Sequence, residues 1–210
     1  MYTIVLWMGD DVNGKELQKH KYVPGQEGYR QANYNYAWYN NPYFAAEDLQ
    51  QIENRDVMNG QLRLNYQILP NLNIQGRAAV REKTTLQEMK VPKTYMNYGD
   101  SREGDYKVWN YRQTNVDADL LVNYTTSLTS DILFTVNAGT SMFYRNYRMD
   151  HQATDGLIVP DVYSIKNSQG PVIADGDRNE KSIRSIYGSM NLDLYDYVFL
   201  TLTGRNDWSS

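Results

Sequence analysis

Three times along the chain, two long alternating segments meet at a turn of two or three residues, and long polar segments separate these pairs. In the third pair, residues 186–194 alternate apolar and polar side chains, residues 195–197 form the turn, and residues 198–205 alternate again. A period of two predicts β-strands with one apolar and one polar face. Short turns at one end and long loops at the other are typical of a transmembrane β-barrel.

The other two pairs follow the same rule. Residues 62–68 and 72–80 alternate on either side of the turn Leu69-Pro70-Asn71. Residues 115–124 and 132–141 form the second pair, for which we expect the turn near residues 127–130. The sequence therefore predicts an all-β fold, an antiparallel meander of about six long strands in three hairpins.

The segments between the hairpins are predicted to be loops. Residues 83–107 and 148–182 are rich in polar residues, Gly and Pro. Residues 1–56 are predicted to be an extracellular loop region with short helical pieces, and residues 57–210 a partial barrel. Within the first segment, the helical pieces are expected at residues 12–21 and 45–54.

Alternation alone does not separate a barrel from a soluble β-sandwich, whose strands also have one wet face. The predicted strands reach or exceed the ~9–11 residues that cross a bilayer, whereas soluble strands have ~5–6. Tyrosine is abundant, with 19 Tyr against 4 Phe. Many tyrosines fall near predicted strand ends, as in interface girdles: Tyr66, Tyr124, Tyr195 and Tyr197 by the short turns, and Tyr106, Tyr144 and Tyr147 towards the long loops.

Six strands are too few to close a membrane barrel, because the smallest have ~8. An open sheet edge in hydrocarbon leaves backbone groups unpaired, at several kcal/mol each. We therefore expect this chain to be part of a larger barrel or to pair with other chains.

Composition argues against several other kinds of protein. A net charge of -4 leaves no basic footprint, so we expect no nucleic-acid partner. There is no Cys, which excludes a disulfide framework and thiolate metal sites. No stretch approaches the ~20 apolar residues of a spanning helix. A mean hydropathy of -0.68 is compatible with a barrel, whose lumen and loops are polar.

No constellation of residues predicts catalysis. His20 and His151 fall in separate predicted loops without a nucleophile signature nearby. Asp117 and Asp119 lie on one strand face, where a hydrated wall is favoured over a glycosidase pair. Asp175-Gly176-Asp177-Arg178-Asn179-Glu180 begins like a calcium loop but lacks Gly at the sixth position and has Ile186 where Glu is needed. We predict a polar surface turn there, and no enzyme activity, metal site or cofactor.

Two sets of side chains are candidates for contact with other molecules. Polar strand residues would line the lumen of a barrel and tune its selectivity: Arg63, Arg77, Asp117, Asp119, Asn137, Asn191 and Asp193. A dense aromatic cluster among Asn residues could hold a substrate or a partner, or could pack a large loop onto its neighbours: Tyr34, Tyr36, Trp38, Tyr39, Tyr43 and Phe44.

Several motifs resemble those of one transporter family. The C-terminal run Leu200 to Ser210, which contains Gly204-Arg205-Asn206-Asp207-Trp208-Ser209-Ser210, resembles a barrel strand and loop start of the SusC/RagA family of TonB-linked outer-membrane transporters. Residues 185–192 look like the strand before that motif. Asn41-Pro42-Tyr43-Phe44, followed by Arg55-Asp56-Val57-Met58-Asn59-Gly60, resembles another family segment.

The resemblance implies a barrel of about 22 strands in the outer membrane of a Gram-negative bacterium. It also implies a SusD-like surface lipoprotein as partner, energy supplied by TonB, and glycans or peptides as cargo. The matching motifs cover only the middle of the barrel, so TonB would act through a plug and Ton box outside this chain.

We therefore expect the barrel segment of an outer-membrane nutrient importer. The main alternative is a soluble all-β carbohydrate-binding module that uses the loop aromatics as a sugar platform. A passive porin or a surface adhesin is a third possibility.

Overall fold

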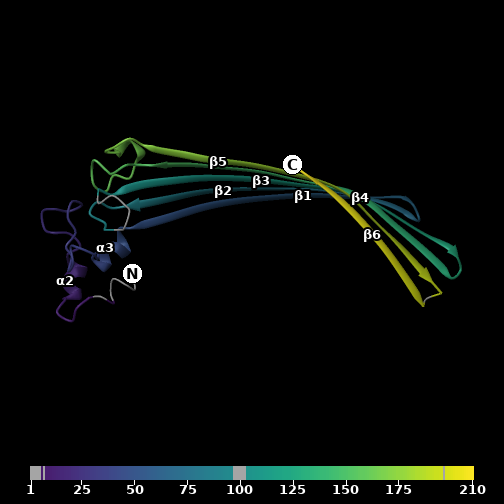
Figure 1. The fold of residues 1–210 in the computed structure, drawn as a ribbon, viewed down its shortest axis with the longest axis horizontal. Coiled ribbons are helices and arrows are strands. Elements are labelled where there is room, and N and C mark those ends of the chain that lie inside the picture. Colours follow the sequence, from purple (N-terminus) through teal and green to yellow (C-terminus); the bar gives the residue numbers. More distant parts are fainter. Residues whose placement is uncertain (1–5, 7, 97–102, 196) are drawn as a thin grey trace. The chain divides into compact units, whose positions relative to one another are not determined.

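In a computed structural model, which describes residues 6, 8–96, 103–195 and 197–210, the chain forms one six-stranded sheet. Neighbours in the sheet are neighbours in the chain, in the order β1-β2-β3-β4-β5-β6 (Figure 1). This confirms the predicted all-β meander. The strand bounds are Gln50–Leu69 for β1, Leu72–Val91 for β2, Asp105–Thr129 for β3, Ile132–Ala153 for β4, Ile173–Leu194 for β5 and Val198–Ser209 for β6.

The short turns lie where the alternation breaks. Only two residues separate β1 from β2, and only two separate β3 from β4. The second of these turns is at residues 130–131, just past the predicted place, because β3 continues to Thr129. In the third, Tyr195 has a φ of 57° and its N–H donates to the Asp131 carbonyl at 2.7 Å. Asp196, the central residue of that predicted turn, lies outside the described residues.

The predicted loops at 83–107 and 148–182 are too long. β2 continues to Val91, β3 begins at Asp105, β4 continues to Ala153, and β5 begins at Ile173. β1 likewise begins at Gln50, within the segment expected to be loop. Charged residues on both faces hide the period-two pattern in these stretches. Backbone pairing nevertheless continues there, because ladder hydrogen bonds do not require an apolar face.

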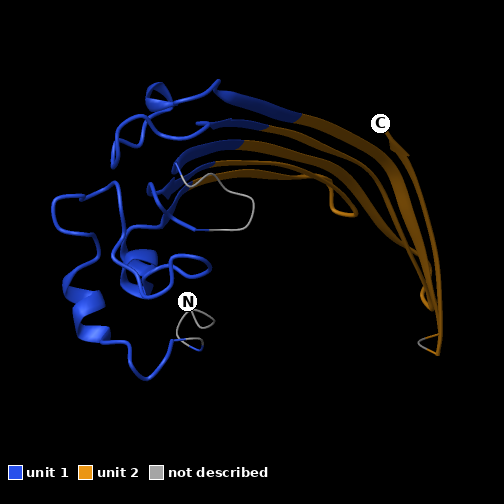
Figure 2. Ribbon diagram, turned by 60° about the vertical axis from the view of Figure 1, so that its left-hand side comes forward, with its two compact units in different colours: residues 1–55, 85–111, 149–177 blue, residues 56–84, 112–148, 178–210 orange. Residues whose placement is uncertain are grey.

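The chain divides into two compact units, blue and orange in Figure 2. Unit 1 holds residues 1–55, 85–111 and 149–177; unit 2 holds residues 56–84, 112–148 and 178–210. Among the described residues, every buried hydrophobic side chain belongs to unit 1: Leu17, Phe44, Val91, Ala153 and Leu157.

Unit 1 contains two short helices, each started by an asparagine cap. The Asn13 side chain accepts hydrogen bonds from backbone N–H groups at the start of α2, Gly14–Lys19. Asn41 does the same for α3, Pro42–Glu47, whose first residue is a proline. Both are standard start signals for helices. The first lies within the expected segment, whereas the helix expected at 45–54 lies earlier in the chain because Asn41 and Pro42 begin it.

Asn41 also holds the core of unit 1 together. Its side-chain N–H groups donate to the carbonyls of Leu17 at 2.9 Å and Ala32 at 2.8 Å. Beside it, the fully buried Phe44 meets the Tyr22 ring edge-on, with centroids 5.6 Å apart. The motif Asn41-Pro42-Tyr43-Phe44 therefore supplies both a helix start and a packing centre.

Unit 2 consists of strand residues that keep their aliphatic side chains exposed. Even-numbered positions form its apolar face, which has no second layer among the described residues. Exposed fractions there include 64% for Leu64, 59% for Ile186 and 56% for Leu200. No described helix is long and apolar enough to cross a bilayer.

Candidate functional site

The odd-numbered positions of unit 2 form a polar face, and this face carries the predicted lumen residues. Arg77 on β2 donates from Nε to the Asp119 carboxylate on β3 at 2.7 Å. The two side chains are 42% and 25% exposed, so this is a partly hydrated ion pair. Two residues that sequence reasoning placed on one face are thus brought into direct contact.

Asn137 connects three strands on the same face. Its Oδ1 accepts from Asn123 on β3 at 2.7 Å, and its Nδ2 donates to Ser189 on β5 at 3.0 Å. Ser189 in turn stands opposite Thr203 on β6. The outcome is a row of uncharged hydrogen-bonding side chains that crosses β3 to β6.

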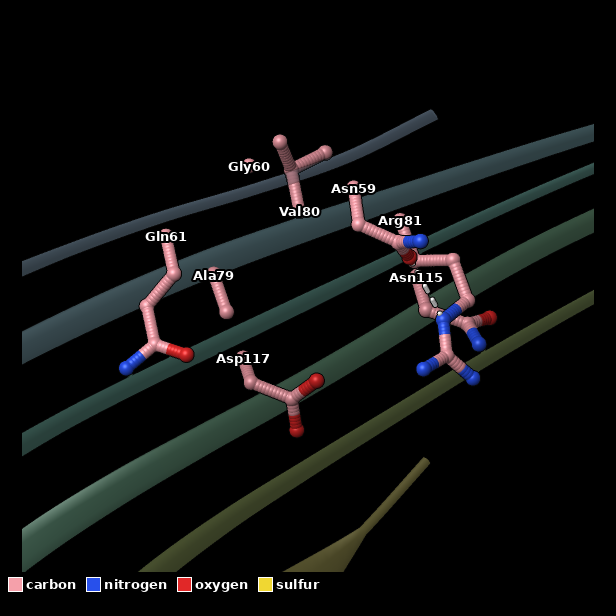
Figure 3. A pocket seen from close by; sticks show the side chains of 8 residues that line it. All are labelled: Asn59, Gly60, Gln61, Ala79, Val80, Arg81, Asn115 and Asp117. Carbon is pink, nitrogen blue, oxygen red and sulfur yellow. Dashed lines mark hydrogen bonds between the residues drawn. The ribbon is translucent and has the colours of Figure 1, made fainter. Parts of the chain in front are cut away.

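Asp117 borders a hollow of about 310 Å³ over β1, β2 and β3 (Figure 3). Arg81 donates from Nε to Asn59 at 2.9 Å, with Asn115 beside them. Val80, from the same strand, points away from these polar groups (Figure 3). Carboxamides, a guanidinium and a carboxylate at one hollow can hydrogen-bond both hydroxyl-rich and amide-rich molecules.

Asn191 and Asp193 border a second hollow of about 310 Å³ between β4, β5 and β6. Asn191 stands opposite Thr201 in the ladder. The Oδ1 atom of Asp193 is buried and has no hydrogen-bond partner among the described residues. Arg63 on β1 is exposed, and no hydrogen bond or ion pair joins it to another described residue. These candidates therefore occupy one face but several separate places on it.

Sequence reasoning missed several polar residues of the hollow over β1 to β3. Asn59 and Gln61 precede Arg63 on the same face of β1, so continuing the alternation backwards by steps of two would have found them. Arg81 follows from Arg77 in the same way.

A second missed group surrounds Arg205 on β6, which stands opposite Tyr187 on β5. Its guanidinium lies over the Tyr187 ring, 5.7 Å from the centroid, and donates to Ser185 Oγ at 2.9 Å. It also donates to Asp207 at 2.9 Å. The sequence did offer one indication of this group, since Arg205 belongs to the C-terminal motif that resembles the SusC/RagA family.

The aromatic cluster of unit 1 separates into exposed and buried parts. Trp38 is 61% exposed, and Tyr36 lies beneath Arg30 at 5.3 Å. Tyr34 and Tyr39 stack on each other, with centroids 6.4 Å apart. Tyr43 is half-buried and Phe44 is fully buried. Contact of this cluster with cargo or a partner stays a prediction, with Tyr36 and Trp38 the most accessible members.

Beside this core lies a cluster of ionisable groups. Lys21 contacts Asp48 at 2.8 Å and Glu47 at 3.0 Å, and Tyr22 donates to Asp48 at 3.2 Å. Burial opposes the charge of Lys21, but the hydrogen bonds that its ammonium group donates to the two carboxylates, together with their charges, prevail and raise its pKa. Burial, followed by nearby carboxylates, raises the pKa values of Tyr22 and Tyr163 above their ordinary range.

The candidate catalytic and metal residues are dispersed. His20 lies 3.7 Å from Glu16. His151 lies in β4 rather than in a loop, and its ring stacks on Trp109 with centroids 4.8 Å apart. The calcium-like run Asp175 to Glu180 lies in β5 and is extended, so the predicted surface turn is wrong. No group of three or more potential metal ligands was found among the described residues.

Comparisons with known proteins identify the fold. No protein-family model matches the chain, and no curated protein matches it. Among solved structures, the RagAB peptide importer in the open-open state superposes on 82% of this chain with a TM-score of 0.73 and 15% identity. The closed-closed state gives 82%, 0.72 and 16%. A further structure of the RagAB peptide transporter gives 81%, 0.73 and 15%.

The chain spans 19% of the length of those solved chains. The open six-stranded sheet is what a part of a larger barrel should show, because its two edge strands, β1 and β6, have no further neighbour among the described residues. The resemblance to the SusC/RagA family is therefore confirmed at the level of the fold: the chain has the fold of a segment of the RagAB importer chains.

Proposed function

We propose that this chain is a barrel segment of a TonB-dependent outer-membrane importer of the SusC/RagA type. Support comes from the fold it shares with the RagAB importers and from the terminal motif around Arg205. The importer would reside in the outer membrane of a Gram-negative bacterium.

One observation carries the proposal: unit 2 has long strands, an exposed aliphatic face, and no buried hydrophobic side chain among its described residues. Burial of apolar surface is the dominant stabilising term for a protein in water. A soluble module would use Leu64, Ile186 and Leu200 to form a core. A barrel segment instead places them against lipid, while neighbouring strands satisfy the backbone.

The polar face would then border the lumen. Its ion pair Arg77–Asp119, its amide row through Asn137 and its hollow beside Asp117 offer hydrogen bonds without any reacting group. The function would be passage and selection, with no bond chemistry. Similarity to peptide importers favours peptides as cargo, with oligosaccharides as the alternative.

The partners belong to the same proposal. A SusD-like lipoprotein would cover the importer at the cell surface, and TonB would act through a plug and Ton box outside this chain. Tyr36 and Trp38 are exposed aromatic side chains that could contact such a partner or cargo.

The direct test is insertion of the full-length protein that contains this chain. Leu64→Asp and Leu120→Asp place a charge on the apolar face, where a charge facing hydrocarbon is destabilising. We expect both to abolish recovery of folded protein from outer membranes. The matched variants Gln61→Asp and Thr201→Asp, on the polar face, should insert normally.

A soluble carbohydrate-binding module predicts another result. The unaltered protein would then be monomeric and cooperatively folded without detergent, and Leu64→Asp would unfold it in buffer. That outcome would overturn the proposed function.

A further inference from the structure

On the apolar face of unit 2, the apolar side chains stop at a defined position along each strand. On each strand, an unbroken run of even positions carries neither a charged nor an amide side chain. The runs cover residues 58–68, 72–80, 114–128, 132–144, 186–194 and 198–204. All six therefore begin near the short turns and end part-way along the strand.

The next polar group on that face marks the end of each run. It is Glu82 on β2, Arg112 on β3, Asn146 on β4 and Arg184 on β5. We call these four residues the polar row; Asp56 on β1 and Asn206 on β6 stand at the corresponding ends of their strands. A change on every strand of one sheet indicates a common boundary rather than chance composition.

Members of the polar row make contacts to neighbouring strands. Arg112 donates from Nε to the Glu82 carboxylate at 2.9 Å, and its side chain is 67% exposed. Asn146 donates from Nδ2 to Glu180 at 3.0 Å. Charges on the lipid face cost ~2–4 kcal/mol at the bilayer midplane but only ~0–1 kcal/mol near its interfaces. These groups are therefore readily accommodated at or beyond the boundary of the hydrocarbon, but not inside it.

Aromatic residues accompany the polar row. Trp208 stands opposite Arg184 in the β5–β6 ladder and is 53% exposed. Tyr144 is the last residue of the uncharged run on β4. Trp and Tyr are enriched at the level of the lipid headgroups, where a ring is apolar on one side and wet on the other. Tyr66 and Tyr124 occupy the same face near the short turns, at the opposite end of the runs.

The lengths of the runs on β1, β2 and β5 agree with this placement, whereas the runs on β3 and β4 are longer. A tilted strand crosses the hydrocarbon in ~9–11 residues, and residues 72–80 and 186–194 lie at the short end of that range. The strands themselves continue well past the polar row, for example to Val91 on β2 and to Ala153 on β4. Because the runs on β1, β2 and β5 already span the hydrocarbon, we expect the strand residues past the polar row to lie outside it.

We propose that the polar row is one edge of the lipid-contacting surface. The hydrocarbon of the bilayer covers the apolar face from the short turns to Glu82, Arg112, Asn146 and Arg184, and strand residues past this row face water and headgroups. The inference rests on the proposed function, and it adds which strand residues the lipid touches.

Site-directed spin labelling of the full-length protein in phospholipid vesicles tests the boundary, with single cysteines introduced and any others replaced. On β2 the labels are placed at Ala78, Val80, Glu82 and Thr84; on β4 at Ala138, Met142, Asn146 and Arg148. We expect labels at Ala78 and Ala138 to collide several-fold more with oxygen than with a water-soluble nickel chelate. The preference should reverse at Glu82 and Asn146 and stay reversed at Thr84 and Arg148.

The controls separate two kinds of failure. A label at Ala79, on the polar face between two test positions, should not show the lipid preference of Ala78. If labels at Ala78 and Ala138 show no preference for oxygen, these positions do not contact lipid and the proposed function fails. If they show the preference but labels at Thr84 and Arg148 show it equally, the protein is a barrel and only the proposed boundary is overturned.

A second measurement does not depend on labels. Ala78→Arg adds a charge inside the proposed lipid-contacting surface, and Asn146→Arg adds the same charge at its proposed edge. Ala78→Arg should reduce recovery of folded protein from membranes at least tenfold, whereas Asn146→Arg should leave it within twofold. Equal losses for the two variants would contradict the boundary.

Discussion

Gly139 on β4 lies directly beneath the ring of Tyr187 on β5: a Cβ built on Gly139 would stand 2.6 Å from Cζ of that tyrosine. Arg205 covers the same ring, with its guanidinium carbon 5.7 Å from the centroid. The missing side chain thus allows an aromatic ring and a cation to stack across three strands of the polar face. Glycine is required here for close approach, not for its backbone angles.

Gly139→Ala should therefore destabilise the barrel. The Tyr187 ring must shift away from Gly139, which disturbs its stacking with Arg205, and overpacking of this kind costs about 1–3 kcal/mol. The measurement is urea unfolding of the full-length protein in detergent or lipid. Gly204→Ala is the matched control, since a Cβ there meets no atom within 4 Å. If both variants unfold at the same urea concentration, the close approach of Gly139 and the Tyr187 ring does not contribute to stability.

Asp119→Asn removes the carboxylate that meets Arg77 at 2.7 Å. Both groups are partly hydrated, so the loss of stability should stay below about 1 kcal/mol. If this face borders the lumen, the freed guanidinium should shift cargo preference towards anionic molecules. Uptake of matched acidic and neutral peptides by cells that carry each variant measures this preference.

Arg77→Gln, alone and combined with Asp119→Asn, completes a double-mutant cycle for the same pair. The double variant should restore the original ratio of acidic to neutral uptake, because neither charge remains. A ratio that does not respond to any of the three variants would show that the pair stands outside the cargo path.

The hairpins and the two faces of unit 2 were predictable from sequence because aliphatic and polar residues alternate there with few exceptions, such as Leu121 and Leu133 on the polar face. The strand stretches beyond Val80 and before Val116 were not, since Glu82 and Arg112 place charge on the face that carries aliphatic residues elsewhere. The polar row removes the periodic signal while its ion pair supports the pairing of the strands. The charged residues of the polar row thus explain both findings: they made the predicted loops too long, and they mark the inferred edge of the lipid-contacting surface.

The aromatic cluster shows a different limit of sequence reasoning. Trp38 and Phe44 belong to one dense run, yet the first is 61% exposed and the second is fully buried. Their difference follows from Asn41, whose contacts with Leu17 and Ala32 close the core around Phe44. Such contacts link residues far apart in the chain and leave no periodic trace.

Asn41→Ala tests that explanation. It removes a helix cap and leaves two carbonyls of unit 1 without their donors, so we expect a local loss of about 2–4 kcal/mol. Hydrogen exchange in the full-length protein should report faster exchange of residues in α2 and α3. Asn13→Ala removes only the exposed cap of α2 and should cost about 0.5–1 kcal/mol. Equal exchange in the two variants would mean that Asn41 does not organise this core.

Alkaline pH should loosen unit 1 through Tyr22 and Tyr163. Burial and neighbouring carboxylates raise both pKa values in the folded state, whereas an unfolded tyrosine titrates near ~10. Below pH ~10 both states hold these protons and the two groups contribute no pH dependence. Above it the unfolded state releases protons that the folded state retains, so the free energy of unfolding falls as pH rises. Phenolate absorbance should show these tyrosines ionising late, together with increased hydrogen exchange in unit 1. Tyr22→Phe and Tyr163→Phe should each lessen the loss of stability, and an unchanged alkaline transition in both would show that other groups cause it.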